Sequence, residues 1–462
     1  NQVTGVTSTE NDSDYKKASA AWYAATGTKW LPKDEDWQMN DGVDNFMVYN
    51  ADGTPAITNK SGVTLDSPIL ASTRIRGNVT QQMPKKAFAV KLDKKSGVLD
   101  MKPHKRWVLL ANWKDRTLMR NAVAFGIAKK FKETYPNDGI AWNPSGQFVE
   151  LVYNGVHVGN YYLCEQIKID ENRLNIKEPY DAEDTYSGNA ADYGYLMECD
   201  DGYDETWKFV TKKYIPFLFK DDGNEDMLNY AAGFVRGLEE KITAGKYTEA
   251  YKSMDLTSMV DFLLIQDLMM NSEMKHPKSC YTYINNGIFY AGPIWDFDWN
   301  TLPVNSSYSE ESYSFTKSML AKASVKSSSS YPSSPKTSDK NYIWYTFLTQ
   351  DNTTFNTLAA QRWNGVVSAI QGFVNNDIPA IKSKIAKSEA ENNAMWPVDA
   401  KDDSKSKRRG SLYGIGGGWS TSSAGYCGDE GLTFDEAVST LQNTLNTRIS
   451  GMNTYVNNKS WK

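Results

Sequence analysis

The sequence predicts an α+β fold, because it combines hairpin patterns with long stretches of helical periodicity. The clearest hairpin joins 147–153 to 156–163 through Asn154-Gly155, a turn dipeptide that matches the twist of paired strands. A second hairpin is predicted over 281–290. Asp255 is expected to cap one of the helices. Apolar residues recur at helical spacing over 117–131, 226–244, 255–271, 343–349, 354–388 and 434–457.

A strand-loop-strand pattern covers 69–92. In its second strand the even-numbered residues from Phe88 to Leu92 are large and apolar, whereas the odd-numbered ones are Ala87, Ala89 and Lys91. This period of two predicts a strand with one buried face. Lys91 is therefore expected on the surface.

Composition disfavours several classes of protein. No run of about 18 apolar residues occurs, so the chain as given contains no expected membrane span. Cys164, Cys199 and Cys280 lie in apolar, strand-like contexts typical of buried free thiols, and the cysteines lack the spacing of a zinc site. The three histidines have no partner at metal-ligand spacing, which disfavours zinc and Ser-His-Asp hydrolases. The polar opening 1–14, which begins without Met, suggests an exported and processed protein.

Charge is distributed unevenly along the chain. Residues 74–132 contain sixteen Lys and Arg and three Asp, whereas 178–205 contain ten Asp and Glu and no Lys or Arg. A basic part facing an acidic part would suit a metal–polyphosphate ligand. Two solvated surfaces that merely differ in charge are the alternative. The basic stretch lacks a base-reading module, so nucleic acid is not an expected partner.

Composition and periodicity together divide the chain into five regions. The expected order is a tether and lead-in, a β-rich region, a central region, a Ser-rich insertion and a helical region. Their bounds are 1–30, 31–170, 171–303, 304–341 and 342–462.

Two carboxylates follow the second hairpin in the segment Trp295-Asp296-Phe297-Asp298. If this segment is a strand, Asp296 and Asp298 point to the same side and the aromatic residues to the other. Paired carboxylates suit Mg²⁺, which takes oxygen ligands and leaves positions open for phosphate. A solvated turn after a buried strand is the alternative interpretation.

Several segments occur in an order that resembles one known family. They are Arg74-Ile-Arg-Gly-Asn, Pro84-Lys-Lys, 107–121, 150–167, 194–198, 255–261, Asn271-Ser-Glu and 292–298. Together they resemble the CotH (spore-coat protein H) kinase family, an atypical branch of the protein-kinase-like fold. The resemblance covers most of 70–300 and continues more weakly in the C-terminal helices. It implies a two-lobe architecture, with a β-rich N-lobe in 31–170, the centre of a mainly helical C-lobe in 171–303, and extra C-terminal helices.

The resemblance also implies an ATP site in the β-rich region. The backbone of Gly77-Asn78 would approach the phosphates closely, although an ordinary hairpin turn is the alternative. Lys85 or, preferably, Lys86 would neutralise the α- and β-phosphates. Arg76 would be a further phosphate contact.

Other implied positions surround this pocket. Arg120 would order it, or else would simply pair with Asp115 at the start of a helix. Glu165 resembles the acidic residue that enters the hinge between the lobes. Gln166 and Ile167 would then lie beside the adenine.

The catalytic-loop position departs from the family pattern. The family has Asn-x-Asp there, and this chain has Asn271-Ser272-Glu273, 23 residues before Asp296. Glu273 is expected to act as the general base, but its side chain is one methylene longer. A misplacement of about 1 Å can reduce a rate on the order of a hundredfold. Glu198 and Asp200 are either ligands or, preferably, part of the acidic rim.

The implied function is that of an exported, spore-coat-like atypical kinase that transfers phosphate from Mg²⁺-ATP to a protein acceptor. Nucleotide and protein are the expected partners. The expected location is secreted or at the cell surface, with a lipid anchor before processing as one route. The alternative is a non-catalytic cell-surface adhesin or assembly scaffold with a vestigial kinase-like pocket.

Overall fold

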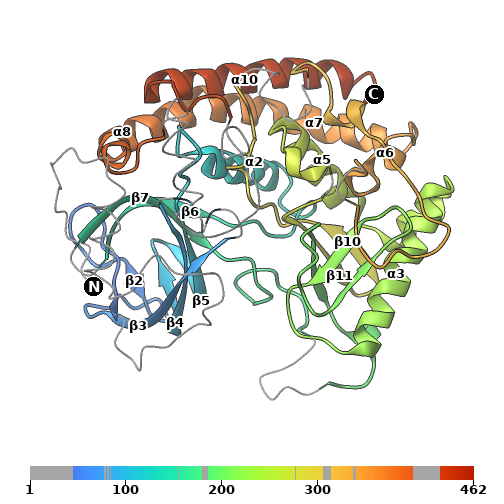
Figure 1. The fold of residues 1–462 in the computed structure, drawn as a ribbon, viewed down its shortest axis with the longest axis horizontal. Helices are drawn as coiled ribbons and strands as arrows, with labels where there is room; N and C mark the ends of the chain where they lie inside the picture. The colour runs from blue at the N-terminus through green and yellow to red at the C-terminus, as the bar shows by residue number, and fades with distance from the viewer. Residues whose placement is uncertain are drawn as a thin grey trace, which may run out of the picture. The chain divides into compact units, whose positions relative to one another are not determined.

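The computed structural model shows an α+β protein, as the sequence predicts (Figure 1). The residues that it describes are 45–77, 80, 83, 85–153, 156–178, 186–275, 277–304, 314–336, 340–398 and 427–462. The predicted tether, Asn78 and the Asn154-Gly155 turn lie outside them.

The chain divides into two compact units, and neither is a single stretch of sequence. The first comprises Asn1–Ala122, Ser145–Gln166 and Pro379–Val438, and the second comprises Val123–Pro144, Ile167–Ile378 and Ser439–Lys462.

A seven-stranded antiparallel sheet forms the centre of the first unit. Its strands are β1 (Asn45–Phe46), β2 (Ile57–Thr58), β3 (Ile69–Arg76), β4 (Ala87–Val98), β5 (Met101–Leu110), β6 (Gly146–Tyr153) and β7 (Val156–Glu165). The order is β1-β3-β4-β5-β7-β6, and β2 pairs with β4. Both the strand-loop-strand pattern and the first predicted hairpin are confirmed.

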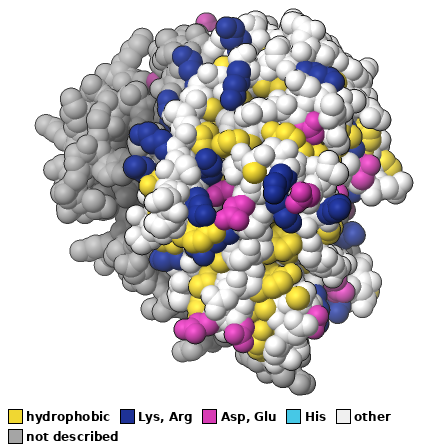
Figure 2. Space-filling model, turned by 90° about the vertical axis from the view of Figure 1, so that its right-hand side faces the viewer, with side chains coloured by type: hydrophobic (Ala, Val, Ile, Leu, Met, Phe, Trp, Pro, Cys, Tyr) yellow, Lys and Arg dark blue, Asp and Glu magenta, His cyan; other side chains and the backbone are white. Residues whose placement is uncertain are grey.

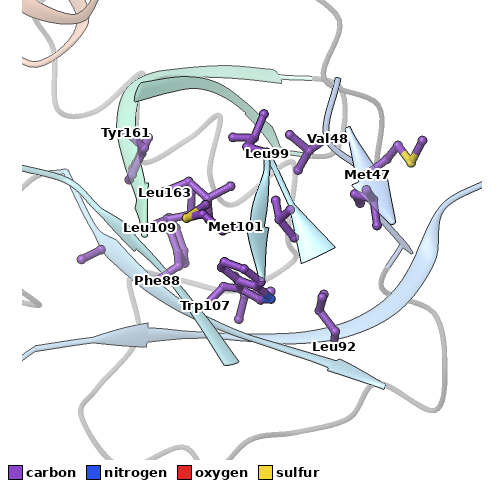
Figure 3. Close-up of a cluster of buried hydrophobic side chains, with 14 of the residues drawn as sticks. Met47, Val48, Phe88, Leu92, Leu99, Met101, Trp107, Leu109, Tyr161 and Leu163 are labelled. Atoms are coloured by element: carbon purple, nitrogen blue, oxygen red, sulfur yellow. The ribbon is translucent and has the colours of Figure 1, made fainter. Parts of the chain in front are cut away.

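One face of this sheet carries the core of the first unit. Phe88 and Leu92 of β4, Trp107 of β5 and Leu163 of β7 lie in one buried cluster (Figure 3). They are 3%, 0%, 0% and 1% exposed, so each contributes roughly 1.5–3 kcal/mol of hydrophobic stabilisation. The even-numbered face of β4 is buried in this core, as its alternation predicts. The other face is not simply exposed, because Ala87 and Ala89 are buried as well and Lys91 is half-buried.

A five-stranded antiparallel sheet belongs to the second unit, in the order β12-β11-β8-β10-β9. The strands are β8 (Tyr195–Cys199), β9 (Lys208–Val210), β10 (Pro216–Phe219), β11 (Cys280–Asn285) and β12 (Ile288–Ala291). β11 and β12 confirm the second predicted hairpin. Cys199 and Cys280 are buried and free, as expected, and so are Cys164 and Cys427.

The helices match the predicted periodic segments closely. They are α2 (Arg120–Thr134), α3 (Glu225–Thr243), α4 (Tyr247–Ala250), α5 (Leu256–Leu268), α6 (Tyr345–Leu348), α7 (Phe355–Gly372), α8 (Ile378–Met395) and α10 (Phe434–Tyr455). Asp255 caps α5 as expected, because its side chain accepts a 2.7 Å hydrogen bond from the Ser258 amide. A π-helical stretch, Phe373–Asp377, joins α7 to α8. None of the described helices is long and apolar enough to cross a membrane.

A buried ion pair holds the C-terminal helix within the second unit. The Arg448 guanidinium lies 3.3 Å from a carboxylate oxygen of Asp267 and donates to the Asp267 carbonyl at 2.6 Å. The Tyr455 hydroxyl donates to the same carboxylate at 2.6 Å. Both charged side chains are 0% exposed, so each depends on the other for compensation of its charge.

Arg448→Met should therefore destabilise the protein by about 3–5 kcal/mol, because the Asp267 carboxylate is left buried without its cation. Lys129→Met is the matched control, since the Lys129–Glu133 pair is 74% and 50% exposed. It should change stability by no more than about 1 kcal/mol. Chemical denaturation measures both variants, and equal effects would contradict the importance of the buried pair.

Candidate functional site

A cluster of carboxylates gathers in the second unit around Glu273. This residue lies in the 3-10 helix Ser272–Met274, which is capped by Asn271, whose side-chain oxygen accepts from the Glu273 amide at 3.1 Å. The Glu273 Oε2 atom is buried and has no hydrogen-bond partner among the described residues. A buried acceptor left unsatisfied costs about 1–3 kcal/mol, so it marks a position where a ligand or proton is expected.

Burial and negative neighbours raise the pKa of Glu273 well above its ordinary value. Desolvation is the largest cause, and the next is the nearby Asp296 carboxylate. Asp200 and Asp298 act in the same direction, whereas Lys278 opposes them. The structure thus brings the predicted general base together with both predicted metal ligands.

The expected strand at Trp295-Asp296-Phe297-Asp298 is wrong. β12 ends at Ala291, and the following residues form an irregular segment, so the two-residue strand period does not place the two aspartates. Asp296 instead has φ of 64°, in the left-handed region that non-glycine residues rarely adopt. The Ser279 hydroxyl donates to its carboxylate at 3.1 Å. Trp295 and Phe297 are 6% and 0% exposed, so buried aromatic side chains anchor the segment.

β8 supplies the two further acidic residues. Glu198 forms a 2.7 Å ion pair with Lys220, and burial raises its pKa. Asp200 follows the strand, and burial together with Glu198 raises the pKa of Asp200 to about 7. Its side chain accepts a 2.6 Å hydrogen bond from the Gly202 amide.

Lys278 is a member of the cluster that the sequence did not single out. Its ammonium lies 3.6 Å from an Asp201 oxygen. Burial lowers the pKa of Lys278, but the carboxylates of Asp201, Asp200 and Glu273 raise it by more, so the pKa is raised overall. Lys278 lies in the loop between Glu273 and β11, where no periodic pattern marks a residue. Only its closeness in sequence to Glu273 could have indicated that Lys278 belongs to the cluster.

The donor atoms of the cluster suit a hard cation. Carboxylate oxygens are the ligands that Mg²⁺ prefers, and the unsatisfied Glu273 oxygen lies among them. Within the described part of the chain, no group of three or more His, Cys, Asp or Glu side chains is arranged to hold a metal ion. The assignment of Asp296 and Asp298 as metal ligands therefore remains a prediction. Water and phosphate would have to fill the other coordination positions of the metal.

The predicted phosphate contacts of the first unit lie where β3 ends and β4 begins. Arg76 pairs across the sheet with Ala87, and Gly77 has φ of 103°, a conformation that favours glycine. Lys86 precedes β4 and is 3% exposed, and burial lowers its pKa to about 7. Lys85 is directed into the protein interior. Its ammonium donates to the carbonyl of Ala111 at 2.7 Å and also to that of Asn160, and it lies 4.4 Å from the centroid of the Tyr161 ring.

Arg120 lies at the start of α2 in a buried polar network. It is 1% exposed, and its guanidinium pairs with Asp115 and, at 2.7 Å, with Asp429. The pairing with Asp115 is the structural alternative that the sequence left open. Asp429 is more than 300 residues away in sequence, and no sequence pattern indicated it.

The predicted adenine-binding residues lie where the chain leaves the first unit. Glu165 ends β7, and its carboxylate accepts from both the amide and the hydroxyl of Ser145 at 2.9 Å. The Gln166 side-chain oxygen is buried without a hydrogen-bond partner among the described residues. The boundary between the two units falls between Gln166 and Ile167.

The molecular face on the side where α3 lies carries charges of both signs. Figure 2 shows Lys and Arg side chains interspersed there with Asp and Glu side chains and with apolar patches. This face therefore carries no uniform excess of either charge.

The raised pKa of Asp200, about 7, predicts a specific pH dependence of stability. Below pH of about 4 the carboxyl is protonated in both states. From there up to about pH 7 only the unfolded state releases the proton, so stability falls by up to about 1.4 kcal/mol per pH unit. Asp200→Asn removes this loss, and thermal denaturation across this range should show the wild-type Tm falling relative to the variant. Asp226→Asn, at an exposed position, should run parallel to wild type, and parallel curves for Asp200→Asn would contradict the assignment.

The chain was compared with known proteins and protein families. The family model described as "CotH kinase protein" matches residues 73–450. No curated protein matches the chain. The matched region holds both the β3–β4 segment and the carboxylate cluster, and it spans most of the sequence. The chain belongs to the CotH kinase protein family.

Proposed function

We propose that this protein is a Mg²⁺-ATP-dependent phosphotransferase with a protein acceptor, working outside the cytoplasm. The observation that carries the proposal is the half-buried Glu273 side chain, which lies near Asp296 and whose Oε2 atom is buried without a hydrogen-bond partner among the described residues. Family membership supports a kinase-like protein. The two compact units are compatible with a two-lobe, kinase-like architecture, which is part of this proposal.

Glu273 would act as the general base. Proton transfer is most efficient when the pKa of the base lies near the working pH, and the pKa of Glu273 is raised well above that of an ordinary glutamate. Its Oε2 atom would accept the proton of the acceptor hydroxyl. The Lys278 cation would hold the neighbouring carboxylates in place through Asp201.

Asp296 and Asp298 would hold Mg²⁺, which neutralises phosphate charge and orients the transferred group. Lys86 and Arg76 would contact the phosphates of the nucleotide. Burial lowers the pKa of Lys86 to about 7, and an anionic ligand beside it would favour the ammonium form again. Gln166, whose buried side-chain oxygen lacks a partner among the described residues, would lie beside the adenine.

The metal assignment is tested with Asp296→Asn. The substitution keeps the shape and an oxygen that can accept from Ser279, but it removes the charge that a cation needs. Wild type should gain Tm when ATP and Mg²⁺ are added together, because ligand that binds only the folded state stabilises it. The variant should lose this gain and keep its unliganded Tm within a few degrees of wild type.

The matched control is Asp226→Asn at the exposed start of α3. It should keep the full shift with ATP and Mg²⁺. An Asp296→Asn protein with a wild-type shift would remove Asp296 from the proposed site.

Turnover is tested at Glu273. Glu273→Gln should lower transfer from labelled ATP to a generic protein acceptor by roughly 10²–10⁴-fold, because the base is lost. Nucleotide binding, followed by the thermal shift, should remain. Glu273→Asp restores the residue of the family pattern and should retain or raise activity, while Glu249→Gln at an exposed position should change nothing.

The second candidate function is an adhesin or assembly scaffold with a vestigial pocket. One observation favours it, namely that Glu273 stands where the family pattern has Asp. Absence of transfer from both wild type and Glu273→Asp, with Mg²⁺ or Mn²⁺, would support this function over catalysis. If neither protein bound nucleotide, the resemblance to kinases would reflect common ancestry and not activity.

A further inference from the structure

β6 forms one edge of the first unit's sheet. It runs for eight residues, Gly146–Tyr153, and it pairs with β7 in a regular register from Gly146 to Leu151. No other strand or bridge in the described part of the chain pairs with it. Edge strands are usually protected from further pairing by a short length, by proline or by several charged side chains. β6 contains no proline, and Glu150 is its one charged residue. It is therefore suited to pair with an added strand.

The backbone groups of Phe148 and Glu150 point away from β7. The Glu165 amide donates to the Ser145 carbonyl at 3.0 Å, so these two residues form a hydrogen-bonded pair next to the first pair of the β6–β7 register. Because such pairs alternate along an antiparallel ladder, the amides and carbonyls of Phe148 and Glu150 lie on the other side of the strand. Asn160, which is opposite Glu150, agrees with this pattern, since its amide donates at 3.2 Å to a side-chain oxygen of α8 and not to β6.

A groove of about 1020 Å³ follows this edge. Every residue from Gln147 to Tyr153 lines it, although successive side chains of a strand point to opposite faces. The groove therefore opens on both faces of the sheet along β6. The segment 45–51 and α8 supply further walls, and all of the lining residues belong to the first unit.

One side of the groove is apolar. Val149 and Leu151 of β6 pack there against the hydrophobic core of the first unit. Val48, Leu99 and Leu163 belong to this core and also line the groove (Figure 3). Apolar side chains of a bound segment would be removed from water on this side, which is favourable.

The other side of the groove is polar and carries Glu150. Its side chain is 36% exposed, and Ser388 and Lys384 of α8 line the groove near it, one helical turn apart. Burial raises the pKa of Glu150, but hydrogen bonds from His157 and Ser388 are the largest of the effects that lower it, and the pKa is lowered overall. Glu150 therefore presents a carboxylate to the groove at neutral pH.

We propose that the edge of β6 binds an extended segment of a partner protein as an added antiparallel strand, with apolar side chains on the core side and a lysine or arginine opposite Glu150. Hydrogen bonds to the backbone of Phe148 and Glu150 supply affinity, and the two sides of the groove select an alternating sequence. Directly opposite residues of paired strands share one face, so the cation of the segment lies beside the Glu150 carboxylate. The antiparallel direction continues that of β5, β7 and β6.

The shape of the groove favours a single segment over the edge of a second folded copy. The segment 45–51 lines the groove on the core side, and α8 lines it on the other. The edge of another sheet carries packed layers on its faces, and these layers would meet the two walls. A lone extended segment brings only its own side chains, which the two sides of the groove can accommodate.

The test measures binding to the full chain without nucleotide, so its failure is distinct from a failure of the proposed phosphotransfer. The probe is a fluorescein-labelled peptide in which valine alternates with threonine and a central lysine replaces one threonine. Fluorescence anisotropy should show that wild type binds it. N-methylation of the threonines and lysine, whose amides face β6, should weaken binding at least about tenfold, because main-chain hydrogen bonds are lost. N-methylation of the valines, whose amides face away from β6, is the matched control and should retain most of the affinity.

Glu150→Gln locates the binding on the protein. Wild type should bind the lysine peptide at least about fivefold more tightly than a peptide with glutamate in its place, because opposite charges on paired strands attract and like charges repel. Glu150→Gln should abolish this preference, whereas Glu249→Gln at an exposed position should keep it. The N-methyl series uses wild type alone, so its result does not depend on how well the variant folds.

Three outcomes would overturn the proposal. They are equal binding of the two N-methylated peptides, a lysine preference that persists in Glu150→Gln, and absence of binding at peptide concentrations of about 1 mM, where even weak complexes form. Dimers that appear in light scattering as the protein is concentrated, and that the peptide dissociates, would instead assign this edge to a second copy of the chain.

Discussion

The buried guanidinium of Arg120 sets the strongest constraint on the first unit. At 1% exposure it needs opposite charge, and Asp115 and Asp429 supply it from sequence positions far apart. The same Asp115 carboxylate accepts from the Thr117 amide at 2.9 Å and from the Arg120 amide at 2.7 Å, so it also shapes the turn that starts α2. Removing Arg120 would leave two carboxylates buried without their cation, whereas removing either aspartate would leave Arg120 with one ion-pair partner. The end of β5, the start of α2 and the segment around Asp429 therefore depend on each other.

Burial also disfavours the charged form of the carboxylates in the cluster of the second unit. There, nearby cations do not fully offset the cost of desolvation. Glu198 has Lys220 as a close cation, whereas the groups that act on Glu273 are mainly other acids, and its Oε2 atom has no hydrogen-bond partner among the described residues. The contrast separates two uses of buried charge. Matched pairs such as Arg120–Asp115 stabilise the fold. In the cluster around Glu273, burial and neighbouring carboxylates instead raise the pKa of Glu273 and Asp200.

Local patterns in the sequence predicted the fold well, because they reflect interactions between near neighbours. The alternation in β4, the hairpin of β6 and β7 and the cap at Asp255 all depend on residues a few positions apart. The strand expected at Asp296 failed because buried aromatics on either side imitate the alternation of a strand, while β12 ends earlier, at Ala291. The separate surroundings of Lys85 and Lys86 could not be predicted either, since the carbonyls that hold Lys85 belong to Ala111 and Asn160. Long-range contacts of this kind, like the one between Arg120 and Asp429, leave no periodic signal in a single sequence.

The interleaved order of the two units has a consequence for how the chain must be made. The first unit includes residues up to Val438, and α8 is tied to it through the Asn160 side chain, which donates to Ser388 at 2.7 Å, and through the ion pair of Arg116 with Glu389. A ribosome that has synthesised the whole β-sheet has therefore not yet supplied the helix that completes it. The polar groups of the sheet that bind α8 therefore lack these partners until more than two hundred further residues have been synthesised. Vectorial synthesis thus delays completion of both units until after α8 has been made, and a chain truncated before α8 would leave neither unit whole.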